Sequence, residues 1–257
     1  MRNTFTIAKK DLKTYFTSPI AYVLMAVFSF IMGFMFFSIL SIYIAQSGQF
    51  GQFGFGKAPS LTDQLIRPVF GNMNVVLLFL VPMITMRLFA EERRNNTIEL
   101  LMTAPVTLWE IVMGKFLSAL AFACILISLT APFMVCLAIA ANPDWSVIAM
   151  AYLGTVFMIG VYISAGVFFS SITENQIVAA ALTFGFILFS WIIKWISYGS
   201  GASSVVGDIL GYLSIVDHYE DFSKGVFNTK DLVFYLSTAG LGLFFNFKVL
   251  ESHTWRS

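Results

Sequence analysis

The stretch Arg87–Pro105 reads RLFAEERRNNTIELLMTAP and carries an unusual share of the charge in this sequence. Only 11% of the 257 residues are charged, yet arginine and glutamate fill six positions of this stretch, three of each sign. Long apolar runs lie on both sides of it. A short, mixed-charge segment between two apolar runs is typical of a connection between membrane spans, where it can offer a surface to a soluble partner.

The composition extends this interpretation to the whole chain. Hydrophobic residues make up 58% of it and the mean hydropathy is +0.82, whereas a soluble domain carries about 25% charged residues. Several apolar runs reach the roughly 20 residues that cross a bilayer as a helix, and the sequence lacks the alternating segments of a membrane barrel. We predict an all-α polytopic membrane protein with a single transmembrane domain over residues 1–257. The six predicted spans are at about 20–45, 70–89, 111–141, 147–171, 177–197 and 231–249.

The N-terminal segment predicts a helix that lies on the membrane rather than across it. One helical face of residues 3–17 is apolar and the other is charged, as in interfacial amphipathic helices. The apolar face holds Phe5, Ala8, Leu12, Tyr15 and Phe16, and the charged face holds Lys9, Lys10, Asp11 and Lys13. Ser18-Pro19 ends this helix. The apolar run that follows is too long for a signal peptide, so we expect it to remain as the first span.

Basic residues determine the predicted orientation. With the N-terminus inside, the inner segments hold ten lysine and arginine residues and the outer segments hold five. Because positive charge is enriched on the cytoplasmic side, both termini and the Arg87–Pro105 stretch are predicted to be cytoplasmic. The outer segment 198–230 contains an apolar face that predicts a short helix resting on, or dipping into, the outer leaflet. That face holds Val205, Val206, Ile209, Leu210 and Leu213.

Residues 51–58 read GQFGFGKA and come close to a phosphate-binding P-loop. Ala58 stands where the motif needs Ser or Thr to hold magnesium, and no buried strand precedes the glycines. We therefore expect this chain to bind no nucleotide and to have no ATPase activity of its own. The net charge of +1 and the lack of a basic stripe also argue against nucleic acid as a partner.

His218 lies among Asp217, Glu220 and Asp221, a combination that could hold a metal ion. The three carboxylates also fall at helical spacing, so the pattern favours a solvated helix face, and we expect no metal.

Ionisable residues deep within a span usually mark a transport pathway or a proton relay. Here Arg87, Lys115 and Lys194 all lie near predicted span ends, where we expect them to snorkel to water. The sequence shows no catalytic combination of serine or cysteine with histidine and carboxylate. An enzyme embedded in the membrane is therefore not supported.

Within the opening stretch, Asn96-Thr97-Ile98-Glu99 indicates a helix start. Asn96 can cap the backbone, and Glu99 can reach back to it as in a capping box. Pro105 ends the helix, because the residue before a proline avoids the α conformation. A helix of about eight residues does not hold itself together in water, so it must pack on the span ends, on a partner or on both. Thr107-Leu108-Trp109-Glu110 offers a second cap before the next long helix.

These segments resemble a known family, the ABC-2-type permeases. The matching segments are MRLFAEERR (86–94), NTIELLMTAPV (96–106) and WEIVMGKF (109–116). Two more, SIVDHYEDFSKGV (214–226) and DLVFY (231–235), are similar to the branch that contains the permease of the bacterial gliding-motility transporter. The resemblance covers essentially the whole chain. Asn96 departs from it, since the family usually has glycine there, but asparagine tolerates a left-handed conformation better than most residues.

The resemblance implies the membrane subunit of an ATP-driven transporter, an exporter of the bacterial inner membrane. It implies a dimer with a second copy or a homologous permease, above two ABC ATPase subunits that bind ATP and magnesium in place of this chain. Segment 91–105 would be the coupling helix on the ATPase, and the outer segment would form re-entrant helices near the exit. The expected coupling residues are Glu91, Glu92, Arg93, Arg94, Asn96, Thr97, Glu99 and Leu101. The expected re-entrant residues are Val206, Ile209, Leu210 and Leu213.

A second hypothesis stands beside transport. The chain would then be a non-transporting anchor or assembly subunit of an envelope or motility complex that the ATPase energises. An accessory envelope protein would be a further partner in that case. The low charge of the spans favours a lipid-linked or amphipathic cargo over a small ion in the transport hypothesis.

Overall fold

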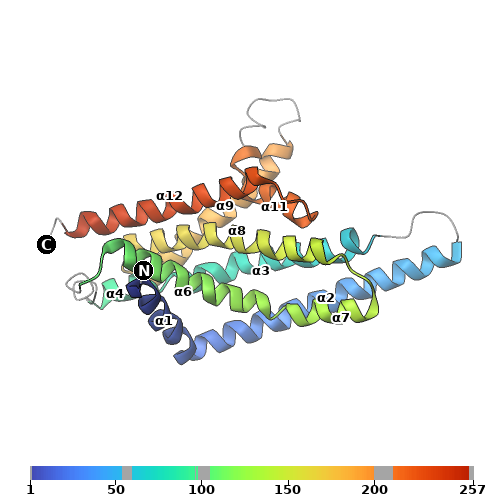
Figure 1. Ribbon diagram of the computed structural model, residues 1–257, viewed down its shortest axis with the longest axis horizontal. Helices are drawn as coiled ribbons and strands as arrows, with labels where there is room; N and C mark the ends of the chain where they lie inside the picture. The colour runs from blue at the N-terminus through green and yellow to red at the C-terminus, as the bar shows by residue number, and fades with distance from the viewer. Residues whose placement is uncertain (1, 54–59, 96, 98–104, 200–210, 255–257) are drawn as a thin grey trace.

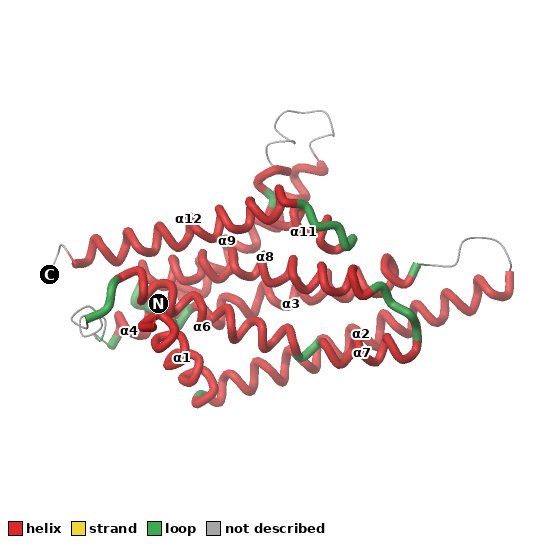
Figure 2. Tube along the Cα trace, in the orientation of Figure 1, coloured by secondary structure: helices red, strands yellow, loops and turns green. Residues whose placement is uncertain are grey.

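The computed structural model describes residues 2–53, 60–95, 97, 105–199 and 211–254. The described residues are 88% helical, and they contain no strand (Figure 2). The all-α prediction is confirmed.

The helices form an elongated bundle (Figure 1). Its long helices are α2 (Pro19–Phe53), α3 (Arg67–Thr85), α6 (Leu108–Ser128), α8 (Trp145–Ile172), α9 (Gln176–Gly199) and α12 (Thr229–Thr254). Its short elements are α1 (Arg2–Thr17), the π-helical turn η1 (Thr62–Ile66), α4 (Ala90–Arg94), α7 (Ala131–Ala140) and α11 (Ile215–Ser223).

Six described helices are long and apolar enough to cross a membrane, as predicted. They cover Pro19–Gly48, Thr62–Arg94, Leu108–Ile139, Trp145–Ile172, Gln176–Lys194 and Thr229–Ser252. The second one starts well before the predicted limit near residue 70. An ion pair of 2.9 Å between Asp63 and Arg67, one helical turn apart, supports the helix there, although these charges lower the local hydropathy.

The third span is broken between α6 and α7. Leu129 and Thr130 form a turn there, and Pro132 follows in the first turn of α7, where a proline has no backbone N–H to donate. The Thr130 hydroxyl donates to the Ile127 carbonyl at 2.7 Å and lies 2.7 Å from the Tyr152 hydroxyl. The break therefore has a local cause in Pro132, and Tyr152 of α8 hydrogen-bonds the Thr130 hydroxyl at the break.

Helix α8 lies at the centre of the bundle, packed against α3, α6, α9, α11 and α12 (Figure 1). Two of its glycines leave no room for a side chain. A Cβ at Gly166 would come within 2.3 Å of the Thr85 hydroxyl on α3, and one at Gly154 within 2.5 Å of Phe222 on α11. Small residues let membrane helices approach closely, so these contacts fix the positions of α3 and α11 along α8.

Both ends of the described chain lie at the end of the bundle that contains α4 (Figure 1). Asn3 donates to the Glu110 carboxylate at 3.3 Å, at the start of α6. Trp109 stacks on Phe247 of α12 with 4.7 Å between the ring centroids. The six spans thus bring the start and the end of the chain back to one end of the bundle.

Helix α1 packs one face on α6, and this face holds Leu12, Tyr15 and Phe16 of the predicted apolar face but not Phe5. Phe5 is 68% exposed, whereas Asp11 lies on the packed side, 3.5 Å from Lys115. Tyr15 stacks on Phe122 at 5.0 Å and donates to the Ile84 carbonyl at 2.8 Å. Burial raises the pKa of Tyr15 well above its usual value. The placement of α1 on a membrane surface stays a prediction.

The predicted solvated helix face holds for the three carboxylates near His218, which are partly exposed, but it does not extend to His218 itself. His218 is 6% exposed, and its Nδ1 lies 2.6 Å from Asp231 Oδ1 at the start of α12. Its Nε2 lies 3.0 Å from the Tyr212 carbonyl, and its ring stacks on Phe234 at 3.9 Å. Helical spacing placed the neighbouring carboxylates correctly on α11, but it could not show that α12 covers His218. Within the described ranges, no group of three histidine, cysteine or acidic residues could hold a metal.

Candidate functional site

The candidate site is the end of the bundle where α3 turns into α4. We call α4 and residues 86–89 before it the α4 junction. Four predicted coupling residues, Glu91 to Arg94, lie on α4, and Thr97 follows it. The remaining three, Asn96, Glu99 and Leu101, lie outside the described residues, as does the predicted capped helix that contains them.

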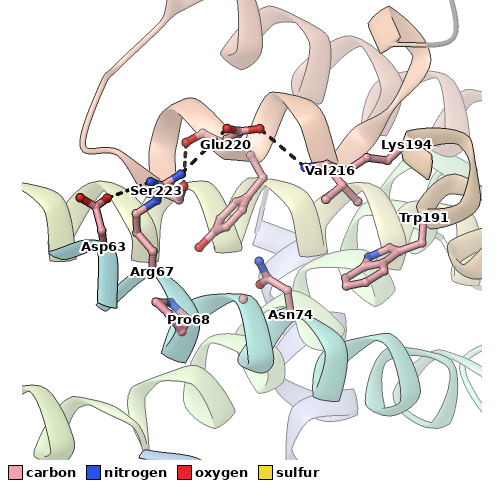
Figure 3. A pocket seen from close by; sticks show the side chains of 11 residues that line it. Asp63, Arg67, Pro68, Asn74, Trp191, Lys194, Val216, Glu220 and Ser223 are labelled. Carbon is pink, nitrogen blue, oxygen red and sulfur yellow. Dashed lines mark hydrogen bonds and ion pairs between the residues drawn. The ribbon is translucent and has the colours of Figure 1, made fainter. Parts of the chain in front are cut away.

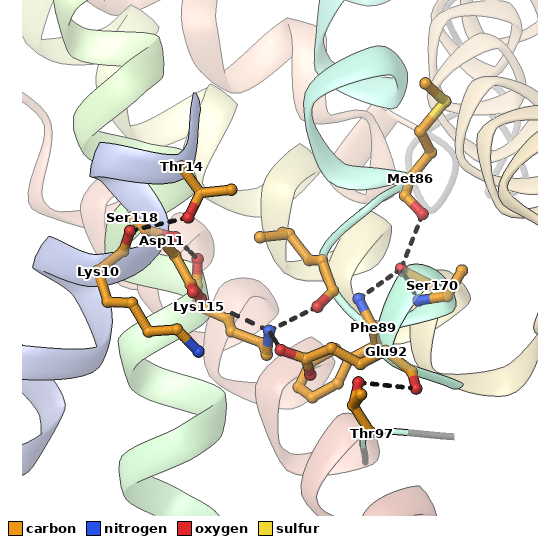
Figure 4. Close-up of polar contacts among 12 residues, drawn as sticks. Lys10, Asp11, Thr14, Met86, Phe89, Glu92, Thr97, Lys115, Ser118 and Ser170 are labelled. Carbon is orange, nitrogen blue, oxygen red and sulfur yellow. Dashed lines mark hydrogen bonds and ion pairs between the residues drawn. The ribbon is translucent and has the colours of Figure 1, made fainter. Parts of the chain in front are cut away.

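The start of α4 is capped by a side chain from α8. The first amides of a helix have no partner within it, and Phe89 at the N-cap position has no side-chain acceptor. The Ser170 hydroxyl fills this role: it accepts from the amides of Phe89 at 3.0 Å and Ala90 at 3.1 Å. It also donates to the Met86 carbonyl at 3.1 Å (Figure 4). Ser170 is fully buried. Its three hydrogen bonds hold the α4 junction against the end of α8.

Lys115 joins the α4 junction to α6 and α1 (Figure 4). Its ammonium group donates to the Leu88 carbonyl at 2.6 Å and to Glu92 Oε1 at 2.7 Å, and it lies 3.5 Å from Asp11 Oδ2. The Phe89 ring centroid is 5.0 Å away. The Lys115 side chain is only 3% exposed, so our prediction that it snorkels to water is wrong. A buried cation needs close partners, and the α4 junction and α1 supply them.

The predicted coupling residues divide into two groups. Glu92 and Arg93 hold the site together, because Glu92 binds Lys115 and the Arg93 guanidinium donates to the Ser171 carbonyl. Glu91 and Arg94 are closer to the surface: Glu91, paired with Arg87 at 3.4 Å, is 45% exposed, and Arg94 is exposed.

Residue Glu92 also holds the segment that follows α4. Its carbonyl accepts hydrogen bonds from the Thr97 amide at 2.9 Å and the Thr97 hydroxyl at 3.2 Å. The side chain of Glu92 points inward to Lys115 while its backbone binds Thr97 (Figure 4). A force applied near Thr97 would therefore reach the buried ion pair through one residue.

A cleft of about 480 Å³ lies between α1 and the α4 junction. Its walls carry lysine, arginine, carboxylate and hydroxyl groups, including those of Lys10, Thr14, Arg87, Glu91 and Thr97. A space of this size at the surface can accept side chains from a docked protein.

The second predicted cap is confirmed at the start of α6. The Thr107 hydroxyl accepts from the Glu110 amide at 3.3 Å, and Glu110 Oε2 accepts from the Thr107 amide at 3.1 Å. This capping box fixes the point at which α6 begins.

The predicted re-entrant segment is described only at its end. Leu213 lies in a helical turn at 211–213 and is 55% exposed, while Val206, Ile209 and Leu210 lie outside the described residues. The depth of this segment in the membrane stays a prediction.

The arrangement is that of a membrane bundle with a rigid, charged joint at one end. Residues 5–245 match the family model described as ABC-2 family transporter protein. The chain belongs to this family. This ABC-2 protein is a multi-pass transmembrane permease subunit, and members of its family are membrane subunits rather than ATPases. A search of curated proteins found no match, and the gliding-motility branch stays a prediction.

Neither Ser170 nor the inward role of Lys115 followed from the sequence. Ser170 is 80 residues from Ala90 in the chain, and nothing near it in sequence marks it as a cap. One feature of the sequence could have indicated that Lys115 is buried. It lies two turns inside an apolar helix, on the same side as the buried residues Ile111 and Ser118. The position of Lys115 near a span end led to the wrong prediction that its side chain reaches water, because α1 covers that end.

Proposed function

We propose that this ABC-2 permease subunit works in the bacterial inner membrane with both termini in the cytoplasm, and that a separate ABC ATPase dimer drives it. The ATPase would dock on segment 91–105 and on the cleft beside α1, and the partner would bind and hydrolyse ATP with magnesium. The observation that carries this proposal is the α4 junction, where exposed charge sits directly on buried contacts to three other helices.

The route of coupling follows from these contacts. Movement of the ATPase would displace the segment near Thr97, and the backbone hydrogen bonds of Glu92 would transmit the displacement to α4. Ser170 would carry it to α8, and Lys115 would carry it to α6 and α1. Because these groups are buried and hydrogen-bonded, the attached helices would move as one body rather than deform.

The proposed direction is export, through a path shared with a second copy or a homologous permease. The alternative is an anchor for an ATPase-energised envelope or motility complex. A transporter in vesicles should show an ATPase rate that rises with its cargo, whereas an anchor should show a rate that does not depend on any cargo.

Charge reversal at the surface of α4 tests the docking directly. The double variant Glu91→Lys/Arg94→Glu changes the exposed charges and leaves Glu92, Arg93 and Lys115 in place. We expect it to reduce co-purification with the ATPase subunit at least tenfold, since like charges would face each other across the interface. The readouts are the amount of ATPase retained on the tagged permease and the ATPase rate of the complex.

The matched control is Lys230→Glu, a charge reversal at an exposed position at the start of α12, near the other end of the bundle. It should retain the ATPase as the wild type does. Full retention by the α4 double variant, or equal loss in the control, would show that the ATPase does not dock here.

A further inference from the structure

A pocket with a different character lies away from the α4 junction. It has a volume of about 400 Å³ and is enclosed by η1 and α3 on one side and by α9 and α11 on the others (Figure 3). We call it the α3–α11 pocket. No contact described for the α4 junction involves its residues, so its function is open.

The rim of the α3–α11 pocket is charged but electrically balanced. Arg67 pairs with Asp63 at 2.9 Å and with Glu220 at 3.9 Å. Lys194 reaches across from α9 to Glu220 at 3.7 Å and to Asp217 at 3.3 Å. Every one of these cations already has a carboxylate, so the rim offers no uncompensated charge to a ligand.

The inner wall of the pocket carries a polar group with unused capacity. Asn74 is only 4% exposed, and its Oδ1 has no hydrogen-bond partner among the described residues. It lies seven residues after Arg67 on α3, about 10 Å deeper at 1.5 Å per residue. The Asn74 side chain points from α3 toward α11, and the Trp191 ring lies beside it from α9 (Figure 3). Buried amide oxygens in native proteins are nearly always hydrogen-bonded, so an unpaired one on a pocket wall points to a ligand.

We propose that the α3–α11 pocket binds a neutral ring that carries several hydroxyl groups, such as a sugar or cyclic polyol. A hydroxyl both donates and accepts, so one such ring can donate to Asn74 Oδ1 and also bond the rim carboxylates and the guanidinium. It can do so without breaking any ion pair, because each carboxylate and guanidinium has spare bonding positions. The indole of Trp191 supplies an apolar wall for the face of the ring.

Charged and zwitterionic ligands fit this pocket less well. An anion in this pocket would lie close to the carboxylates of Asp63 and Glu220, and a cation would lie close to Arg67 and Lys194, so either would meet like charge on the rim. The volume is at the lower end of the range for small-molecule sites, which begins at about 300 Å³. It therefore suits one ring or a head group of that size rather than an extended chain.

The proposal does not rest on the docking of an ATPase, because binding in this pocket involves the permease alone. Its test uses the full chain, purified in a sugar-free detergent such as lauryldimethylamine oxide. Saturation-transfer NMR would measure binding of four probes: glucose and myo-inositol as neutral polyols, glucose 6-phosphate as an anion and phosphocholine as a zwitterion. We expect saturable binding of at least one neutral polyol.

Two variants connect that binding to the pocket. Asn74→Leu should weaken the affinity for the polyol about tenfold through lost hydrogen bonding, and Trp191→Leu should weaken it by removing the wall. Asn246→Leu is the matched control: it makes the same change at another buried asparagine, on α12, which donates to the Val167 carbonyl of α8 and does not line this pocket. It should bind the polyol as the wild type does.

Several outcomes would overturn the proposal. One is the absence of saturable polyol binding to the wild type. Another is equal affinity in Asn74→Leu, Trp191→Leu and the wild type, with the folding of each variant checked by gel filtration. Binding of phosphocholine alone would assign the pocket to a lipid head group instead.

Discussion

The α4 junction and the α3–α11 pocket are built from the same types of charged residue, but we assign them different roles: contact between helices in the first and ligand binding in the second. Each combines lysine, arginine and carboxylates that come from several helices. At the α4 junction the central cation, Lys115, is 3% exposed and meets three partners, which also line the cleft beside α1. In the pocket the cations Arg67 and Lys194 are 30% and 24% exposed and surround a cavity. Charge composition therefore does not distinguish a structural contact between helices from a binding site, but the burial of the central cation does.

The strongest test of this comparison is to remove the central cation of the joint. Lys115→Met should lower the free energy of unfolding by about 3–5 kcal/mol, because it leaves Glu92 and Asp11 without their buried partner. Unfolding by titration with sodium dodecyl sulfate would measure it. Lys248→Met, which removes a 53% exposed partner of Glu251, is the matched control and should cost about 1 kcal/mol or less. Equal losses would mean that Lys115 is not a structural centre.

Removal of the Ser170 cap on α4 should have an intermediate effect on the free energy of unfolding. Ser170→Ala leaves the amides of Phe89 and Ala90 without an acceptor in a buried place, which costs about 1–3 kcal/mol. We expect faster hydrogen exchange at these two amides and a looser α4, with the rest of the bundle unchanged. Ser237→Ala, at an exposed serine that bonds only within α12, should leave exchange as it is. Unchanged exchange at residue 90 in Ser170→Ala would contradict the capping role.

A change at the rim of the α3–α11 pocket should have the smallest effect on the free energy of unfolding. The hydrogen bond from Lys224, helped by the charges of Lys194 and Arg67, holds the pKa of Glu220 below its usual value. Because the folded-state pKa is the lower one, the stabilisation is complete above the unfolded pKa of about 4.3. It is lost as the pH falls through the folded-state pKa.

Glu220→Gln should remove the contribution of Glu220 to the pH dependence of the free energy of unfolding. Since Glu220 is 34% exposed, the loss at pH 7 should be about 1 kcal/mol or less. The measurement compares detergent unfolding of the variant and the wild type at pH 7 and below pH 4. A difference that grows toward low pH would have the wrong sign for a depressed pKa and would reject this account of the rim.

The parts predicted from sequence are those with local causes. Runs of apolar residues marked the six spans, since a bilayer demands length and hydropathy regardless of neighbours. The capping box at Thr107 and Glu110 was predicted because both partners lie three residues apart. The break in the third span also has a local cause, because the missing N–H of Pro132 is a property of the residue itself.

The errors arose where a distant segment decided the environment. Lys115 was expected in water because it lies near a span end, but α1 covers that end and supplies Asp11. His218 was expected on a solvated face, but α12 brings Asp231 against it at 2.6 Å. Neither sequence neighbourhood contains the partner, so periodicity could not identify it.

The sequence by itself determined that this protein is an all-α membrane bundle and which charged segment is displayed at one end of it. Hydropathy and capping act over a few residues, so they can be read along the chain. The tertiary structure alone decided which charges are buried between helices and which lie on the rim of the α3–α11 pocket. That distinction depends on helices more than 80 residues apart meeting at Ser170 and Lys115, and on three helices leaving space beside Asn74.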